Sequence, residues 1–325
     1  MSGAAPVRVA LLGAGTVGSA VARLLLARGQ GYAVRLGRPV ELVGVAVRDA
    51  SRARQGVPAA LLTTDAEALV DRADVVVEVM GGISPARELV ERAMRGGAQV
   101  ITANKQLIAQ HGEQLHALAR ESEVGLDYEA AVMAAVPVMA VVREALAGDE
   151  IRSIRGVVNG STNYILDLVA RERVPFEDAV RRAAELGYLE ADPTEDLEGL
   201  DAAAKIVILA RTAWGGPVGL DDVDRTGISA LTDEDLARAR QDGSVVKLVA
   251  SARPGVDGRP PTVAVRPEAL PADDPLAQVR GGTNVVVVDA LSAGELRLQG
   301  AGAGGEETAS AVLADLLRAA ARVPV

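Results

Sequence analysis

The sequence predicts an α/β protein, with a parallel sheet in its first part and a second region that combines helices with an open sheet. Three observations support this prediction. Strand-like runs alternate with helical stretches up to about residue 128, which is the pattern of βαβ units. A glycine-rich turn joins the first expected strand to the first expected helix. Hydrophobic residues make up 49% of the chain and aromatic residues only 2%, an aliphatic bias that suits a buried parallel sheet.

The first part of the chain alternates between the two kinds of element. Residues 7–13 form an apolar run that predicts a buried strand. Residues 16–29 follow with apolar side chains on one helical face, and Gly29 is expected to end that helix. The other elements expected here are strands at 40–48, 73–82 and 98–105 and a helix at 85–97.

The pattern changes after about residue 128. Residues 160–250 are expected to be mainly helical, and the proline-rich stretch 253–275 to be rich in loops. Short alternating runs at 262–265 and 284–291 indicate strands of an open sheet. A glycine-rich loop and an apolar helix follow at 299–322, and this helix has the apolar face needed to return to the first part.

Composition excludes several classes of function. The formal net charge of −10 argues against nucleic-acid binding, which needs a positive face. The chain has no cysteine, which removes disulfides, thiolate catalysis and thiolate metal sites together. The sequence shows neither a secretory signal nor an apolar run long enough to cross a membrane. We therefore expect a cytoplasmic protein that binds neither nucleic acid nor membrane.

The glycine turn, residues 13–18, fits the pattern G-x-G-x-x-G. Gly13 would allow the tight turn, Gly15 would let the backbone approach a pyrophosphate, and Gly18 would allow close packing of helix and strand. The helix that begins here would offer unpaired N–H groups and a positive dipole end to phosphates. Because the turn follows a strand and opens a helix, it predicts a dinucleotide site; a nucleotide-free α/β fold is the alternative.

The end of the second expected strand bears on the choice of cofactor. Arg48 and Asp49 stand there, with Arg52 and Arg54 close behind. An acidic residue would bind the ribose 2′-hydroxyl of NAD, whereas arginine would hold the 2′-phosphate of NADP. The three arginines favour NADP over NAD, and the alternative is that they only solvate a loop.

Lysine is rare in this chain: of 34 basic residues only three are lysines, Lys105, Lys205 and Lys247. Lys105 follows an expected strand, at the carboxyl edge of the sheet where ligands bind. In a helix over 197–213, Asp201 and Lys205 share one face because they are four residues apart. A surface ion pair, the alternative here, would tolerate arginine, whereas only lysine can exchange a proton near neutrality. Lys247 is expected to snorkel at a sheet edge.

On these motifs the chain resembles the homoserine dehydrogenases, which are NAD(P)-dependent enzymes of the aspartate pathway. The resemblance covers nearly the whole chain, and its most specific part is the acidic segment ELGYLEADPTEDLEGLDAAAKIVILA at 185–210. The other matching motifs are VEVMGG at 77–82, TANK at 102–105, YEAAV at 128–132, NGSTNYIL at 159–166 and GAGAGGEETASAVLADL at 300–316.

The resemblance implies reversible hydride transfer between L-aspartate 4-semialdehyde and L-homoserine, a step in threonine, methionine and isoleucine biosynthesis. It implies a Rossmann dinucleotide-binding domain at 1–128 with 301–325, and an α+β catalytic and dimerisation domain at 129–300. A homodimer is expected. Many relatives carry a further regulatory domain after the last helix; this sequence stops at Val325, so threonine feedback through such a domain is not expected.

Site residues follow from the same resemblance. Lys105 and Lys205 would be the catalytic pair, with Lys205 as the favoured proton donor. Glu190 and Asp201 would bind the ammonium group of the amino acid or fix nearby groups, and Asp196, Tyr188, Gly160 and Ser161 would line the substrate pocket. The residues expected at the cofactor are Gly13, Gly15, Thr16, Val17, Gly18, Arg48, Met80, Gly81, Thr102, Lys105, Gly187 and Gly304. A monovalent cation, usually sodium in this family, would be bound by Glu129, Val132, Ala134 and Val136.

Two departures from the family pattern bear on these expectations. Met133 and Ala135 stand where relatives mostly have glycine, and glycine permits backbone geometries that methionine does not. A nucleotide-binding regulatory protein with a decayed active site is therefore the alternative function. A semialdehyde dehydrogenase is a second rival, but that class usually needs a catalytic cysteine, which this chain lacks.

Overall fold

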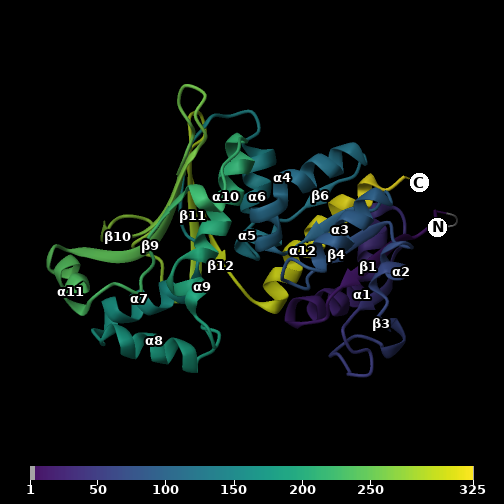
Figure 1. Ribbon diagram of the computed structural model, residues 1–325, viewed down its shortest axis with the longest axis horizontal. Helices are drawn as coiled ribbons and strands as arrows, with labels where there is room; N and C mark the ends of the chain where they lie inside the picture. Colours follow the sequence, from purple (N-terminus) through teal and green to yellow (C-terminus); the bar gives the residue numbers. More distant parts are fainter. Residues whose placement is uncertain (1–3, 325) are drawn as a thin grey trace. The chain divides into compact units, whose positions relative to one another are not determined.

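The computed structural model describes residues 4–324, coloured along the chain in Figure 1. The chain divides into two compact units. The first unit comprises the residues up to 135 together with those from 303 onward, and the second unit comprises residues 136–302. The expected assignment of 1–128 with 301–325 to cofactor binding and of 129–300 to catalysis and dimerisation stays a prediction.

The first unit is built on a parallel six-stranded sheet with the order β3-β2-β1-β4-β5-β6. This order is that of a Rossmann fold, in which ligands bind where the strand order reverses, between β1 and β4. Val75–Glu78 pairs with both neighbours, β1 and β5. The predicted α/β class is confirmed. The strands are β1 (Val7–Leu12), β2 (Val40–Ala46), β3 (Leu62–Thr63), β4 (Val75–Glu78), β5 (Gln99–Thr102) and β6 (Leu126–Asp127).

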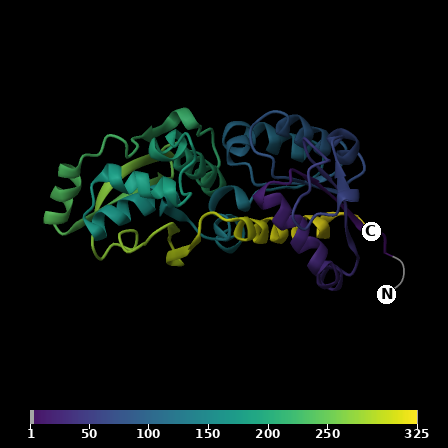
Figure 2. The same cartoon turned by 90° about the horizontal axis from the view of Figure 1, so that it is seen from below.

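Helices cover both faces of this sheet (Figure 2). The first helix, α1 (Thr16–Leu36), packs along α12 (Gly305–Arg322) on one face, so the last helix does return to the first unit. The opposite face carries α2, α3 and α4. The bounds of the remaining helices are η1 (Ala59–Leu61), α2 (Ala66–Val70), α3 (Ala86–Arg95), α4 (Lys105–Glu121) and α5 (Ala130–Met133).

The end predicted for the first helix at Gly29 is wrong. The helix continues to Leu36 and ends at Gly37, which takes a left-handed conformation with φ of 72°. A glycine ends a helix when it adopts that conformation at the position after the last turn. Gly29 stays helical, and its place has open space within 4 Å. The pattern of residues therefore predicted the helix correctly but assigned its end to the wrong glycine.

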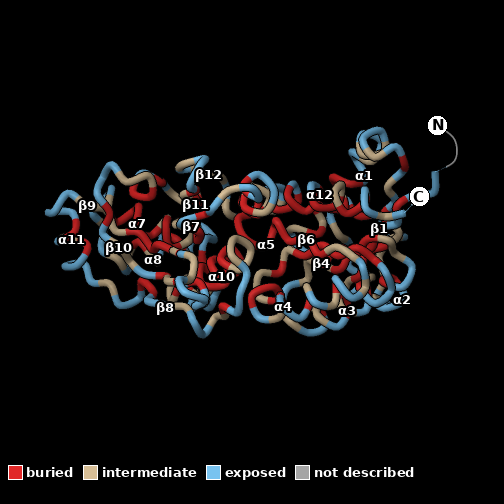
Figure 3. The backbone as a smooth tube through the Cα atoms, turned by 90° about the horizontal axis from the view of Figure 1, so that it is seen from above, coloured by how far each residue is buried: buried red, intermediate tan, exposed pale blue. Residues whose placement is uncertain are grey.

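The core of the first unit joins the sheet to its flanking helices. Val9 and Leu11 of β1 lie in one buried cluster with Val21 of α1 and with Leu316 of α12. Buried segments run along β1, β4 and α12 in Figure 3. Each buried leucine or valine side chain contributes roughly 1.5–3 kcal/mol relative to exposure, so α12 is an integral part of this unit.

The second unit is built on a mixed six-stranded sheet with the order β12-β11-β7-β9-β10-β8. Three of its strands, β7, β8 and β12, were not expected, and β8 falls in the stretch predicted to be mainly helical. The proline-rich stretch is less irregular than predicted, because ten residues of β10 pair antiparallel with β9. The strands are β7 (Ile151–Val157), β8 (Val223–Arg225), β9 (Ser244–Arg253), β10 (Thr262–Pro271), β11 (Thr283–Ala290) and β12 (Gly294–Ala301).

Two helices of the second unit pack directly on this sheet. One of them, α7, contacts β9 and β11, and the other, α10, contacts β7, β9 and β10. The shorter α8 packs on α7, and α9 packs on α10. The helices are α6 (Val138–Ala140), η2 (Val141–Ala145), α7 (Gly160–Glu172), α8 (Phe176–Glu185), α9 (Thr194–Leu197), α10 (Leu200–Trp214), η3 (Leu220–Asp222) and α11 (Asp233–Gln241). Within residues 4–324 no helix has the length and apolar character to cross a membrane.

The expectation that Lys247 snorkels at a sheet edge is wrong. Its strand, β9, lies between β7 and β10 in the middle of the sheet. The Lys247 side chain is completely buried. Its ammonium donates hydrogen bonds to Asn163 Oδ1 and to the carbonyl oxygen of Val279, both at 2.7 Å. Lys247 is therefore an internal cation that protein atoms solvate in place of water.

The free energy of unfolding is expected to depend on pH through Lys247. Burial lowers the pKa of Lys247 from its ordinary 10.5 to about 8; Asp167 opposes this shift and Arg280 adds to it. Below pH 8 the folded and unfolded chains both hold the proton. Between pH 8 and 10.5 only the unfolded chain holds it, so stability rises with pH over that window. At about 1.4 kcal/mol per pKa unit, the free energy of unfolding of wild type should rise over this window by about 3 kcal/mol relative to that of Lys247→Met.

Urea unfolding of both proteins at pH 7 and at pH 10.5 measures that gain. The variant carries every other titrating group, so their contributions cancel in the difference. If wild type and Lys247→Met differ in free energy of unfolding by the same amount at both pH values, the depressed pKa of Lys247 is contradicted.

Candidate active site

The glycine turn of the first unit has the geometry expected of it. Gly13 has φ of +103°, and a Cβ atom there would lie 2.9 Å from the carbonyl oxygen of Val79. A Cβ at Gly18 would clash with the carbonyl oxygen of Gly13, so this glycine lets the helix pack closely on the turn. Gly15 has open space within 4 Å, which leaves its backbone accessible to a ligand.

A cavity of about 770 Å³ opens in front of this turn. Its volume is that of a site for a large organic ligand. The first turn of α1 has no acidic side chain. No carboxylate of that turn therefore opposes the binding of an anion at its N–H groups and positive dipole end. The predicted cofactor residues that line the cavity are Gly13, Gly15, Arg48, Met80 and Gly81. The cavity therefore fits a dinucleotide in volume and lining.

Three arginines, Arg48, Arg52 and Arg54, lie along the wall of this cavity. Asp49, the residue that could bind a ribose hydroxyl, instead accepts hydrogen bonds from the backbone N–H and hydroxyl of Ser51 at 2.9 and 2.6 Å. These bonds lower the pKa of Asp49. Its carboxylate is thus engaged within its own loop, while the positive groups remain at the cavity.

A buried carboxylate that the sequence did not single out connects this cavity to Lys105. Glu78, at the end of β4, accepts hydrogen bonds from Met80 N–H at 2.7 Å and from the Thr102 hydroxyl at 2.5 Å. Burial raises the pKa of Glu78, and these hydrogen bonds oppose the shift. The Thr102 hydroxyl also accepts from Asn104 N–H. Glu78 therefore ties the ends of β4 and β5 together.

Lys105 is the first residue of α4 and is half-buried. Asn104 caps that helix, because its Oδ1 accepts from Leu107 N–H at 3.1 Å. The Asn104 amide also donates to the carbonyl oxygen of Gly82 at 2.6 Å. Lys105 is thus fixed at its backbone by a network that includes the loop after β4, which carries cavity residues.

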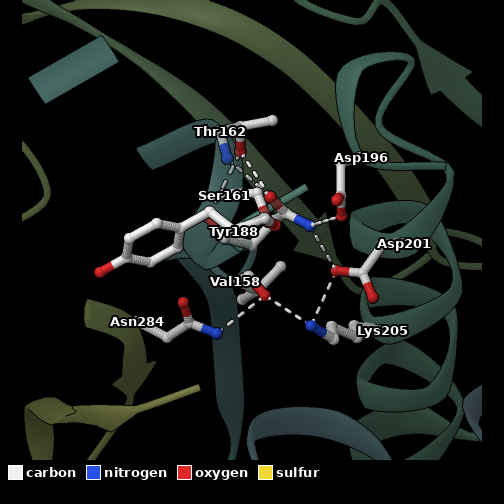
Figure 4. Close-up of polar contacts among 9 residues, drawn as sticks. Val158, Ser161, Thr162, Tyr188, Asp196, Asp201, Lys205 and Asn284 are labelled. Carbon is white, nitrogen blue, oxygen red and sulfur yellow. Dashed lines mark hydrogen bonds and ion pairs between the residues drawn. The ribbon is translucent and has the colours of Figure 1, made fainter. Parts of the chain in front are cut away.

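Lys205 occupies the second unit, on α10 (Figure 4). Its ammonium lies 2.7 Å from Asp201 Oδ2 and donates to the carbonyl oxygen of Val158 at 2.8 Å. Lys205 and Asp201 are both buried, so the alternative of a surface ion pair is wrong. The Asn284 amide donates to the same Val158 carbonyl at 2.9 Å. A buried ion pair of this kind is held in one geometry, which general acid catalysis requires.

Asn159, like Asn284, is a residue of this site that sequence reasoning missed. Its amide nitrogen donates to Asp196 Oδ1 at 2.6 Å and to Asp201 Oδ2 at 2.9 Å. Its Oδ1 accepts from the backbone N–H and hydroxyl of Thr162, both at 2.9 Å, and so caps α7. One buried side chain thus joins two carboxylates to a helix N-terminus. The available signal was the N-cap residue in the motif NGSTNYIL.

The other predicted substrate residues lie around this group. Burial raises the pKa of Asp196, with Asp201 adding to the shift and Asn159 opposing it. The Ser161 hydroxyl donates to the carbonyl oxygen of Tyr188 at 2.7 Å. The ring of Tyr188 stacks on that of Tyr164 with centroids 4.4 Å apart.

The other predicted substrate and cofactor residues lie at more exposed positions or outside the lining of the cavity. Glu190 is exposed, and Gly187, a predicted cofactor residue, lies in the turn after α8 with φ of 77°. Gly304 stands at the start of α12, where a Cβ would clash with the carboxylate of Glu307. The predicted cofactor positions outside the lining of the cavity are Thr16, Val17, Gly18, Thr102, Lys105, Gly187 and Gly304.

The predicted cation ligands give a mixed result. The Glu129 carboxylate is buried, but a guanidinium nitrogen of Arg318 lies 3.9 Å from it, and this positive charge would oppose a cation. The carbonyl oxygen of Val136 accepts from Val138 N–H at 2.8 Å. Ala134 has φ of 44° and ψ of −109°, a backbone conformation that favours glycine. The conformation is therefore adopted by Ala134 and lies between the two departures, Met133 and Ala135. Across the described part of the chain no three His, Asp or Glu side chains gather as a metal site.

Family models match both parts of the chain. The model described as homoserine dehydrogenase matches residues 137–317, and the model described as homoserine dehydrogenase, NAD binding domain, matches residues 13–129. A homoserine dehydrogenase of Corynebacterium glutamicum is 46% identical over 97% of this chain and 72% of its own length. One from Bacillus subtilis is 39% identical over 96% of this chain and 72% of its own.

Solved structures agree with these matches. The crystal structure of a homoserine dehydrogenase from Thiobacillus denitrificans superposes with a TM-score of 0.93 at 38% identity, and the match covers 98% of this chain and 76% of that one. A hyperthermophilic archaeal homoserine dehydrogenase in complex with NADPH superposes with a TM-score of 0.83 at 30% identity, over 98% of this chain and 99% of that one.

Proposed function

This chain belongs to the homoserine dehydrogenase family, and on that premise we propose which of its residues carry the reaction. Enzymes of this family interconvert L-homoserine and L-aspartate 4-semialdehyde with a nicotinamide cofactor, and the chain is such an oxidoreductase. We assign proton transfer to Lys205, with Lys105 as the second catalytic lysine. The observation that carries this proposal is the buried Lys205 ammonium, held between Asp201 and the Val158 carbonyl.

The geometry at Lys205 supports the role of proton donor. An ammonium group has three N–H donors, and described residues engage two of them, which leaves one for a substrate oxygen. A bound nicotinamide cofactor would supply the hydride to the aldehyde carbon. Lys205 then stabilises the developing alkoxide and gives it a proton, a contribution of about 10²–10⁴-fold for general acid catalysis. In the opposite direction the Lys205 amine takes the hydroxyl proton of homoserine.

Two neighbouring carboxylates have different proposed roles. Asp201 holds Lys205 and is itself held by Asn159, so we assign it to fixing the donor. Glu190 is exposed, and we assign it to the ammonium group of the amino acid on the family resemblance. Asp196, Tyr188, Gly160 and Ser161 are proposed to line the pocket for the rest of the substrate.

We propose NADP as the preferred cofactor, because arginines line the cavity while Asp49 is bound within its own loop. Replacing Arg48 and Arg52 together with serine is expected to raise the KM for NADP roughly tenfold, since each charge-assisted hydrogen bond to phosphate contributes about 1.5–3 kcal/mol before exposure weakens it. The KM for NAD should stay within about twofold.

Initial rates at varied NADP and NAD measure this change. The matched control is Arg28→Ser, which removes an exposed arginine of α1 outside the cavity. Equal losses with both cofactors would argue that the arginines act on the loop and not on the 2′-phosphate.

The assay that tests the activity itself follows absorbance at the nicotinamide band with homoserine and either cofactor. Turnover is expected with both. Binding of NADP without turnover would instead support a regulatory protein with a decayed site.

Sodium and a homodimer are further proposals that rest on the family resemblance. The proximity of Arg318 to Glu129 weakens the case for sodium, and no step of the reaction is assigned to it. Exchange of sodium for choline in the assay buffer tests the first proposal, and sedimentation equilibrium tests the second.

A further inference from the structure

Lys247 belongs to a polar network that the reaction described above does not use. Its ammonium lies between β9 and α7, where it donates to Asn163 Oδ1 and to the carbonyl oxygen of Val279. Lys247, Asn163 and Asp167 are all buried. Burying such a network costs folding free energy unless every polar group forms a hydrogen bond. A functional role would explain why this aliphatic core contains one.

The network holds one short loop, residues 279–283, by its backbone. Lys247 binds the carbonyl of Val279, and the Asn163 amide donates to the carbonyls of Gly281 and Thr283 at 2.7 and 3.2 Å. Asp167 accepts from Gly281 N–H at 2.9 Å. It also accepts from Arg280 at 3.0 Å. The loop is thus bonded to α7 and β9 along most of its length.

The other side of the loop faces the proposed substrate residues. A Cβ atom at Gly160 would lie 2.7 Å from the carbonyl oxygen of Gly282. A Cβ at Gly282 would lie 2.5 Å from the ring of Tyr188. The backbone at Gly282 therefore packs against the start of α7 and the Tyr188 ring without room for a side chain.

The loop also leads directly into the surroundings of Lys205. Residue 284 follows it, and the Asn284 amide donates to the Val158 carbonyl, which accepts from Lys205 as well. A displacement of the loop would thus move both Tyr188 and a neighbour of the Lys205 ammonium.

We propose that Lys247 is a positioning residue for the homoserine site, acting through the loop 279–283. The inference rests on the proposed function, because it takes Gly160 and Tyr188 as part of the substrate pocket. Lysine suits this position because its compact ammonium fits between an amide oxygen and a carbonyl. The planar guanidinium of arginine, which the chain otherwise prefers, is larger.

The test compares Lys247→Met, which keeps most of the volume but removes the donors, with wild type. The KM for homoserine is expected to rise roughly tenfold, since a hydrogen bond to a charged group is lost, while the KM for NADP stays unchanged. Hydrogen exchange in peptides covering 279–283 should become faster. The control is Val249→Ala on the same strand, which shares an apolar cluster with Val279 but removes no polar bond.

A chemical rescue separates the ammonium from packing. Because the chain has no cysteine, Lys247→Cys can be alkylated with 2-bromoethylamine while unfolded and then refolded, which restores an ammonium at the same reach. Wild type taken through the same refolding is the reference. Recovery of the homoserine KM supports the inference; an unrestored KM in a refolded protein overturns it.

Three other outcomes decide the matter as well. Unchanged exchange in 279–283, or an unchanged homoserine KM in Lys247→Met, would overturn the inference, and so would an equal rise in Val249→Ala. Failure of the proposed function is recognised separately, because Asp201→Asn would then retain full turnover whatever Lys247→Met does.

Discussion

Replacing Lys205 with arginine is expected to lower kcat by about 10²–10⁴-fold, the range of a lost general acid. Arginine keeps the positive charge but cannot release a proton near neutrality. The buried position between Asp201 and the Val158 carbonyl also has a geometry suited to an ammonium. The KM for the cofactor should change much less, because the described residues that line the cavity belong to the first unit.

Lys205→Met separates the two contributions of this residue. If proton transfer dominates, the arginine and methionine variants lose similar amounts of kcat. If the fixed charge dominates, the arginine variant retains much more activity than the methionine variant. Full activity of Lys205→Arg would remove the residue from the role of proton donor, and Lys105 would then be the candidate. Steady-state rates across pH for both variants give the comparison.

Replacing Asn159 with alanine is expected to lower kcat/KM for homoserine by roughly 100-fold. The substitution removes the hydrogen bonds to Asp196 and Asp201, and a lost hydrogen bond to a charged group costs about 1.5–3 kcal/mol. Asp201 would then hold Lys205 less firmly. The free energy of unfolding should also fall, by about 1 kcal/mol for the lost cap on Thr162 N–H and further for the two lost carboxylate bonds.

The matched control for this variant is Thr232→Ala. Thr232 caps α11 in the same unit, where its hydroxyl accepts from Asp235 N–H at 3.1 Å, and it lies outside the proposed site. Its loss should reduce stability by the contribution of a helix cap, about 1 kcal/mol, without reducing kcat/KM. If both variants lose activity in parallel, Asn159 acts only through the stability of its helix.

The features that the sequence predicted well are those set by neighbouring residues. The turn at Gly13 and Gly18 depends on backbone geometry and close approach within a few residues, so the spacing of glycines was sufficient to identify it. The pairing of Asp201 with Lys205 follows from helical periodicity alone. The final helix was expected to return because its apolar stripe needs a partner.

The features that it did not predict depend on contacts between distant segments. Asn159 was given no role from the sequence, because its bonds to Asp196 and Asp201 arise only when α9 and α10 pack beside α7. Lys247 resembled a surface residue because nothing local reveals that β9 lies inside the sheet. Gly29 and Gly37 both follow a helical pattern, and what separates them is the left-handed backbone of Gly37, with φ of 72°.

The position of α12 in the chain has a consequence for the order of folding during synthesis. Its residues Val312 and Leu316 complete the core of the first unit, yet the second unit, residues 136–302, precedes it in the chain. A ribosome therefore releases the whole second unit before α12 can take its place beside α1 on that face of the sheet. The second unit is continuous in sequence and can fold at this stage. The core of the first unit is then still incomplete, and its apolar surface is exposed. Dependence on chaperones is therefore expected to be greatest at this stage.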